Sequence, residues 1–189
     1  NSQNGCESVA TAVSLTINST PTSPISNNET ACEGSLIPDL FAPGANITWY
    51  TDPALTNNVF SGNSFSTGQT LPNVYTYYVT NSQNGCESAS SSVNLTINAT
   101  PTVPSSSNET ICEGGVVPDL NASGTLVNWY SDQALTNNVF SGNTFSTGQT
   151  LPNVYTYYVT NSQNGCESGY ISVSLTINAK PVTGPISHW

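Results

Sequence analysis

The sequence predicts an all-β protein made of tandem β-sandwich modules. Three observations support this: a fixed internal repeat, apolar residues that alternate with polar ones, and no helical periodicity. The octet Asn-Ser-Gln-Asn-Gly-Cys-Glu-Ser begins at positions 1, 81 and 161, so the repeat has a constant period of 80 (81 − 1 and 161 − 81). A unit of this length can enclose its own small core, unlike the shorter units of a solenoid.

The repeat divides the chain into two complete modules and two partial ones. We expect the complete modules at residues 21–98 and 101–178. Residues 1–18 are interpreted as the last strand of an upstream module, and residues 179–189 as the start of a following module or a terminal stub. The linker at 98–102 is short and contains a proline, which predicts that neighbouring modules are held nearly end to end.

Each module is predicted to hold about seven short strands. The clearest has apolar residues at every second position, as expected of a half-buried strand, and occurs three times: Val13, Leu15, Ile17; Val93, Leu95, Ile97; Val173, Leu175, Ile177. A β-branched and aromatic strand is expected at 74–80, and the Asn84-Gly85 pair after it predicts a type I′ hairpin turn. Further strands are expected at 35–42, 46–52, 58–61 and 64–71. This density of strands and turns is typical of a two-sheet sandwich.

Tryptophans and tyrosines are the expected core residues. Trp49 and Trp129 fall in the middle of equivalent strands and are interpreted as core side chains. One tyrosine near the start of the long strand is expected to form a tyrosine corner, its hydroxyl bonding back to the preceding loop, and Tyr77 and Tyr157 are the chosen candidates. Val79 takes the position at which β-sandwiches with a tyrosine corner often carry a core cysteine. The core is therefore expected to be held together by side-chain packing, without a disulfide between its two sheets.

The five cysteines recur with the repeat and allow two pairing patterns. Either Cys32 bonds Cys86 and Cys112 bonds Cys166 within modules, which leaves Cys6 for an upstream partner, or Cys6 bonds Cys32 and Cys86 bonds Cys112 across boundaries. The first pattern is favoured, because a loop of some fifty residues removes roughly 4 kcal/mol of chain entropy from the unfolded state and a small module gains most from it. Disulfides place the protein outside the cytosol.

Composition excludes several classes of function. The chain has one lysine, Lys180, no arginine, and a net charge of −10, so it lacks the cations that bind nucleic acid. An enzyme is not expected, because the sole histidine, His188, lies outside both modules and no serine, histidine and acid set occurs within one. No cysteine or histidine spacing suits a metal, no Asp-x-Asp-x-Asp calcium loop is present, and no cofactor is expected.

The chain carries no apolar run close to the roughly 20 residues of a membrane-spanning helix, so membrane insertion of this segment is not expected. Asparagines in Asn-x-Ser/Thr sequences are candidate glycosylation sites, and they are Asn18, Asn28, Asn46, Asn94, Asn98, Asn108 and Asn121.

Several motifs together resemble the Ig-like repeats of large surface proteins from gliding and related Bacteroidota-type bacteria. They are Asn-Glu-Thr-x-Cys-Glu-Gly, Pro-Asp-Leu, a Trp-Tyr strand, Tyr-Tyr-Val-Thr-Asn-Ser-Gln-Asn-Gly-Cys-Glu-Ser, and a closing Leu-Thr-Ile-Asn strand. The resemblance covers nearly all of residues 21–180. It implies immunoglobulin-like β-sandwiches arranged in series, in stalk segments of long adhesins on the bacterial cell surface, and it supplies no catalytic residues.

Two functions follow as hypotheses. The first is a structural stalk or filament, whose partners are neighbouring repeats of the same chain and other filament copies; the filament is either one covalent chain or subunits that lend the strand at 9–18 to a neighbour. The second is a multivalent module that binds surface glycans by avidity. Its candidate contacts are Tyr50, Phe60, Phe65 and the loop Thr56-Asn57-Asn58, although the two phenylalanines suit the sandwich edge better.

Overall fold

The computed structural model describes residues 1–182 and 184, and the remainder of the expected segment 179–189 lies outside the described residues. All regular structure among the described residues is β, which confirms the predicted fold class. The described chain contains no helix long and apolar enough to cross a membrane. The described residues form two compact units, one of residues 1–29, 38–68 and 74–95, the other of residues 30–37, 69–73, 96–182 and 184.

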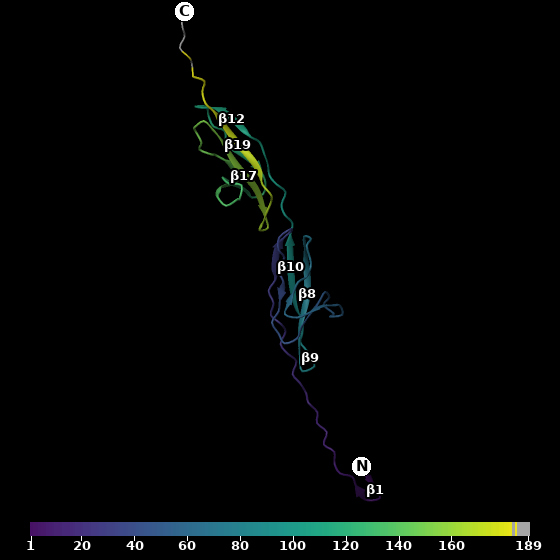
Figure 1. Ribbon diagram of the computed structural model, residues 1–189. Coiled ribbons are helices and arrows are strands. Elements are labelled where there is room, and N and C mark those ends of the chain that lie inside the picture. The colour runs from purple at the N-terminus through teal and green to yellow at the C-terminus, as the bar shows by residue number, and fades with distance from the viewer. Residues whose placement is uncertain (183, 185–189) are drawn as a thin grey trace, which may run out of the picture. The chain divides into compact units, whose positions relative to one another are not determined.

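The second repeat consists of a large sheet, a short hairpin strand and a small sheet. The large sheet has the order β12-β19-β17-β14-β15, β18 pairs with β17, and the small sheet has the order β11-β13-β16. Figure 1 shows β12, β19 and β17 lying together. The strands are β11 (Ser105–Ser106), β12 (Glu109–Cys112), β13 (Leu120–Ser123), β14 (Val127–Tyr130), β15 (Asn138–Ser141), β16 (Thr144–Phe145), β17 (Asn153–Gln163), β18 (Cys166–Glu167) and β19 (Ile171–Asn178).

The first repeat has a similar arrangement one period earlier in the sequence, but its small sheet has no counterpart of β11. Its large sheet has the order β3-β10-β8-β5-β6, β9 pairs with β8, and β4 pairs with β7 in a small sheet. The strands are β3 (Glu29–Cys32), β4 (Leu40–Phe41), β5 (Ile47–Tyr50), β6 (Asn58–Ser61), β7 (Ser64–Phe65), β8 (Asn73–Gln83), β9 (Cys86–Glu87) and β10 (Ser91–Asn98). The sequence did not predict β3, and the predicted strand at 35–42 is reduced to β4.

Alternation along the strands places one face of each in the core. In β19, Val173, Leu175 and Ile177 are at most 3% exposed, while the polar residues between them face outward. With β17 and β14 these residues form the core of the second repeat around Trp129, which is fully buried. Trp49 is fully buried at the equivalent place in the first repeat.

The hairpin turn forms where the Asn-Gly pair predicts it. Asn84 and Gly85 have φ angles of 51° and 78°, and Asn164 and Gly165 repeat them at 51° and 80°. Positive φ at both central residues is the requirement of a type I′ turn, which asparagine and glycine tolerate best. The turn sets the register of β17 with β18, in which Gln163 pairs with Cys166.

The N-terminal segment differs from its prediction. It forms a small hairpin of β1 (Ser2–Gln3) and β2 (Cys6–Glu7), and no strand between residues 8 and 28. Val13, Leu15 and Ile17 are 86–92% exposed, although their copies in β10 and β19 are buried. A strand exists only where another strand pairs with it, and no described segment pairs with residues 9–18.

Candidate functional site

A disulfide joins the first repeat to the second. It links Cys32, the last residue of β3, to Cys166, the first residue of β18, across a sequence separation of 134 residues. Both cysteines belong to the same compact unit, because that unit includes residues 30–37 as well as the described chain from residue 96 onward. Cys166 is 2% exposed, and Cys32 is half-buried.

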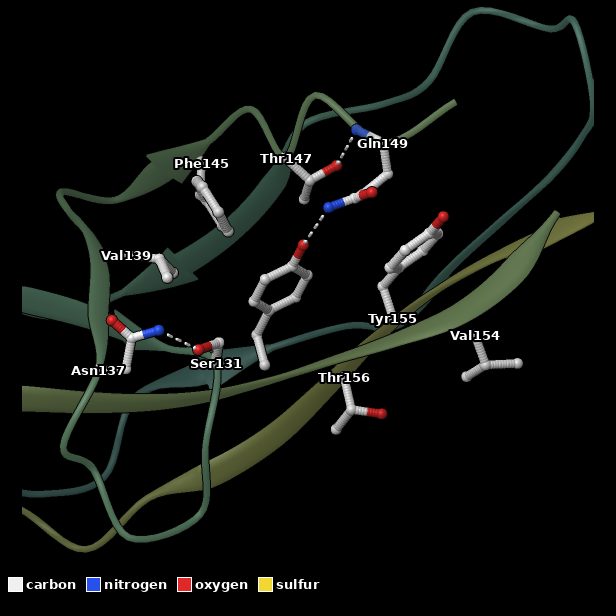
Figure 2. Close-up of a pocket in the computed structure, with 10 residues that line it drawn as sticks. Ser131, Asn137, Val139, Phe145, Thr147, Gln149, Val154, Tyr155 and Thr156 are labelled. Carbon is white, nitrogen blue, oxygen red and sulfur yellow. Dashed lines mark hydrogen bonds between the residues drawn. The ribbon is translucent and has the colours of Figure 1, made fainter. Parts of the chain in front are cut away.

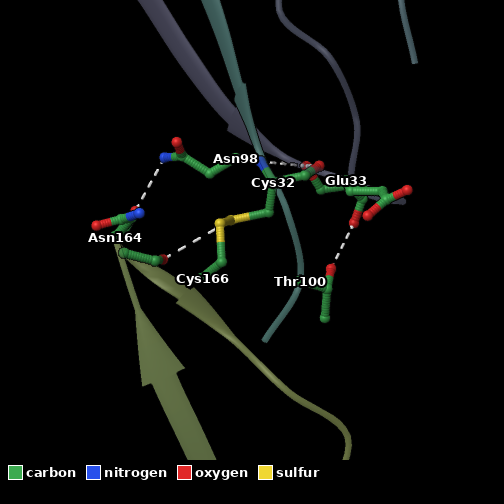
Figure 3. The surroundings of a disulfide bond; sticks show 8 residues. Cys32, Glu33, Asn98, Thr100, Asn164 and Cys166 are labelled. Atoms are coloured by element: carbon green, nitrogen blue, oxygen red, sulfur yellow. Dashed lines mark hydrogen bonds between the residues drawn. A yellow bond between two sulfur atoms is a disulfide. The ribbon is translucent and has the colours of Figure 1, made fainter. Parts of the chain in front are cut away.

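Hydrogen bonds connect the two chain segments that carry Cys32 and Cys166 (Figure 3). The Asn98 side-chain amide donates to the Asn164 carbonyl at 3.0 Å, in the turn that precedes Cys166. The Glu33 amide, next to Cys32, donates to the Asn98 carbonyl at 2.8 Å. Asn98 therefore contacts both the residue that follows Cys32 and the turn that carries Cys166.

This bond corrects the expected cysteine pairing. The structure leaves Cys6, Cys86 and Cys112 as free thiols, so neither the within-module bonds Cys32–Cys86 and Cys112–Cys166 nor the bonds Cys6–Cys32 and Cys86–Cys112 are formed. The disulfide in fact pairs Cys32 with the hairpin cysteine of the following repeat.

Strand direction explains why the within-module bond is not formed. In the second repeat β12 runs parallel to β19, which places Cys112 beside Asn178, and Asn153 of β17 pairs with Ile177 at the same end of the sheet. Cys166 pairs with Gln163, ten residues further along β17. At about 3.3 Å per residue the two cysteines stand roughly 33 Å apart, far beyond the roughly 7 Å between Cα atoms that a disulfide can span.

A second recurring feature is a carboxylate in the hairpin that binds two hydroxyl groups. Glu167 accepts hydrogen bonds from Thr160, which is fully buried, and from the Tyr130 hydroxyl at 2.8 Å. Burial and the bond to Glu167 raise the pKa of Tyr130 above its ordinary value of 10.0. Glu87 makes the same pair of bonds in the first repeat, so the glutamate after each hairpin cysteine fixes the hairpin to its sheet.

An aspartate organises the loop after the Trp-Tyr strand. Asp132 accepts bonds from the backbone amides of Thr136 and Asn137 at 3.1 and 2.7 Å and from the Thr136 hydroxyl. These bonds favour the charged carboxylate and lower its pKa below the ordinary value of 3.8. The loop contains Leu135 at a φ of 57°, a left-handed conformation that leucine rarely adopts, so the aspartate stabilises a strained turn.

Asp132→Asn is expected to reduce the dependence of stability on acid pH. A carboxylate whose pKa is lowered by folding contributes stability above its unfolded pKa, and this contribution is lost as the pH falls through its folded pKa. Thermal unfolding should be followed from about pH 7 down to about pH 2, and the Tm of the parent should exceed that of Asp132→Asn by an amount that shrinks as the pH falls. A difference in Tm that stays constant across that range would contradict the role given to this carboxylate.

The second repeat has an open pocket of about 640 Å³ beside β17. Figure 2 shows Phe145, Thr147, Gln149 and Tyr155 on one side of the strand, while Val154 and Thr156 point to the other. The full lining is Ser131, Asn137, Val139, Phe145, Thr147, Gln149, Val154, Tyr155, Thr156 and Tyr157. Nine of these ten residues recur unchanged one period earlier; the tenth, Ser131, is replaced by Thr51.

In the second repeat, Tyr155 and the chosen Tyr157 both bond the loop that precedes β17. Tyr155 donates to the Leu151 carbonyl at 3.0 Å. Tyr157 is buried with its ring edge-on to Phe145, and its hydroxyl accepts a bond from the Gln149 side chain at 3.5 Å. Side chains alternate along β17, so Tyr155 and Tyr157 lie on the same face of the strand; in the first repeat, Tyr77 is likewise buried and packs edge-on against Phe65.

Most of the residues proposed to contact glycans pack or form hydrogen bonds within the chain. Phe65 is 7% exposed and stacks on Phe60, which is 37% exposed. The Tyr50 hydroxyl bonds Glu87, and the backbone amides of Thr56 and Asn57 bond Asp52. Phe60 therefore keeps the largest open ring surface of this set.

The candidate glycosylation asparagines all bond within the chain through their side chains. Asn18, Asn46, Asn98 and Asn121 donate from the amide nitrogen to a backbone carbonyl. Asn28, Asn94 and Asn108 accept at the amide oxygen, which leaves the nitrogen outside those bonds. Among the residues the structure describes, no group of three metal-binding side chains occurs.

Comparison with known proteins identifies the class of domain. The family described as Ig-like domain CHU_C associated matches residues 20–101 and again residues 99–179. The chain is thus a tandem Ig-like protein, and it belongs to this family. A search of curated proteins found no match.

Solved structures of two-domain segments align along most of the chain. DIP-gamma IG1+IG2 is 12% identical, with a TM-score of 0.32, and the alignment covers 82% of this chain and 96% of that one. The Ig1-2 module of the Drosophila receptor protein tyrosine phosphatase DLAR is 13% identical, with a TM-score of 0.27 and coverage of 81% and 95%. Human mucin-like protocadherin EC1-2 is 11% identical, with a TM-score of 0.33 and coverage of 83% and 98%.

The family and the disulfide together indicate the general class of function and the location of the protein. Ig-like domain families are typically non-enzymatic, and tandem copies serve as structural or binding repeat modules. A disulfide-bonded Ig-like protein is characteristic of an extracellular or surface location.

Proposed function

We propose that the chain is a stalk or filament segment of a long bacterial cell-surface adhesin, and that its disulfide carries tension from one repeat to the next. The supporting observation is the position of the Cys32–Cys166 bond. In a chain pulled from both ends, force runs from the N-terminal segment into Cys32, through the sulfur atoms, and out from Cys166. The intervening residues of both repeats lie outside this covalent path.

This route limits how far the segment can lengthen. The loop between Cys32 and Cys166 contains β4 to β17, which are most of the strands in both sandwiches. Among the described strands, β1, β2 and β3 before the loop and β18 and β19 after it lie on the loaded path. A stalk built in this way keeps most of its length folded under load, which suits a spacer that holds a distal region away from the cell.

Single-molecule pulling between the two termini tests the proposal. The oxidised chain should stop short of the reduced chain by the 134-residue loop, about 450 Å at roughly 3.3–3.6 Å per residue. Two within-repeat bonds would hide 54 residues each (86 − 32 and 166 − 112), about 370 Å in total. Equal final lengths with and without reductant would show that the disulfide carries no load and would refute the proposal.

A second candidate function, multivalent glycan binding, is favoured by the recurrence of the pocket lining in both repeats. Weak sites in an array gain strength by avidity. A glycan array probed with the whole chain should then give hits that weaken for Phe140→Ala, whose ring stacks on Phe145 beside the pocket, while the exposed control Val116→Ala leaves them unchanged. An array without hits would remove this candidate.

A further inference from the structure

Two of the free cysteines are the repeat equivalents of the two bonded ones. Cys112 lies one period after Cys32, and Cys86 lies one period before Cys166. We propose that Cys86 and Cys112 are open halves of the same disulfide, and that Cys112 of one copy of this chain bonds Cys86 of a second copy. The inference concerns connectivity alone and does not rest on the stalk proposal.

The hairpin that carries Cys86 already shows the contact that accompanies the formed bond. The Asn18 side-chain amide donates to the Asn84 carbonyl at 2.9 Å. This is the Asn98–Asn164 bond displaced by one period, and that bond stands beside the Cys32–Cys166 disulfide. Cys86 Sγ lies 3.7 Å from the Asn18 carbonyl oxygen. A strand end that occupies the place of Asn18 would therefore bring its own cysteine next to Cys86.

The strand end that carries Cys112 matches the one that carries Cys32. The Glu113 amide donates to the Asn178 carbonyl at 2.8 Å, as the Glu33 amide does to the Asn98 carbonyl, also at 2.8 Å. Cys112 pairs with Asn178 in the parallel register of β12 and β19, and Cys112 is exposed. Asn178 is the counterpart of Asn18 and of Asn98 at the same place in the repeat, so it is the residue that would dock on the Asn84 turn of a second copy.

Bond formation requires an oxidant. The two S–H bonds break, one Sγ–Sγ bond forms, and two protons and two electrons pass to a disulfide compound, which is reduced to two thiols. Oxidised glutathione supplies this acceptor in the experiment, and a disulfide oxidant would supply it in an oxidising extracellular compartment.

The test uses two variants of the whole chain, each with one reactive thiol. Cys6→Ser with Cys86→Ser retains Cys112 as its only free thiol, and Cys6→Ser with Cys112→Ser retains Cys86. When the two variants are mixed with oxidised glutathione, we expect the mixed dimer to exceed each dimer of like chains about tenfold on a non-reducing gel, since a tenfold preference corresponds to a modest docking energy. Asn18→Ala in the Cys86 variant should increase the yield, because it releases the chain's own segment from the docking place.

Controls separate docking from random oxidation. The triple variant without Cys6, Cys86 and Cys112 should give no dimer, and one thiol per chain in each reactive variant should confirm that Cys32–Cys166 is intact. From equal amounts of the two variants, a mixed dimer that exceeds each like dimer by no more than the factor of about two given by random pairing would overturn the proposal. So would the absence of a mixed dimer when Asn18→Ala is present.

Discussion

Replacing Cys166 with serine is expected to lower the free energy of unfolding by about 2–5 kcal/mol, the range found when native disulfides are removed from small domains. The bond closes a loop of 134 residues, for which the chain-entropy relation gives about 5 kcal/mol as an upper figure. The variant also leaves Cys32 as a new free thiol. Urea denaturation followed by the fluorescence of the buried tryptophans measures the loss.

The matched control is Cys86→Ser, which changes a hairpin cysteine of the same sequence context. Cys86 has no sulfur partner, so this variant should unfold within about 0.5 kcal/mol of the parent, as is usual for changes away from stabilising contacts. Adding reductant should bring the parent to the stability of Cys166→Ser and leave that variant unchanged. If Cys86→Ser were as damaging as Cys166→Ser, the pairing in the structure would be wrong.

Trp129→Ala is expected to destabilise the second repeat by about 3–5 kcal/mol, which is the cost of removing a large buried aromatic side chain. Trp129 is fully buried, lies 5.4 Å from Phe145 between ring centroids, and donates from Nε1 to the Gly142 carbonyl at 2.9 Å. The substitution removes this packing and leaves a carbonyl without its donor. Urea denaturation monitored by circular dichroism checks the size of the effect.

Two further variants identify the source of that loss. Trp129→Phe keeps much of the ring packing but removes the Nε1 donor, so its free energy of unfolding should lie between those of the parent and the alanine variant. Val116→Ala changes a residue that is 91% exposed and should cost little. A cost for Trp129→Ala below about 1 kcal/mol would mean that this tryptophan does not organise the core, since that is the typical effect of any substitution.

Local patterns in the sequence predicted most of the sandwich. The alternation of Val93, Leu95 and Ile97 predicted β10, and Asn84-Gly85 predicted the hairpin and its turn type, because both features depend on near neighbours in the chain. β3 was missed because its four residues, Glu-Thr-Ala-Cys, carry only one buried apolar side chain. Its place is fixed by pairing with β10, a strand about sixty residues away in sequence that no local pattern reveals.

The disulfide could not be predicted from spacing for a related reason. Loop entropy compares the lengths of possible loops, and it favoured the bond within a module. Geometry decides otherwise, since β12 runs parallel to β19 and so ends at the opposite end of the sheet from the hairpin. This pairing of the first strand with the last excludes the Cys112–Cys166 bond, and cysteine spacing alone does not reveal it.

Disulfide mapping tests the central claim, that Cys32 of one repeat is bonded to Cys166 of the next. Cleavage after glutamate under non-reducing conditions places Cys32 in residues 30–33, Cys112 in 110–113, Cys86 in 34–87 and Cys166 in 114–167. We expect mass spectrometry to find fragment 30–33 linked to fragment 114–167, with 34–87 and 110–113 released as free thiols. Fragment 30–33 linked to 34–87, together with 110–113 linked to 114–167, would contradict the claim.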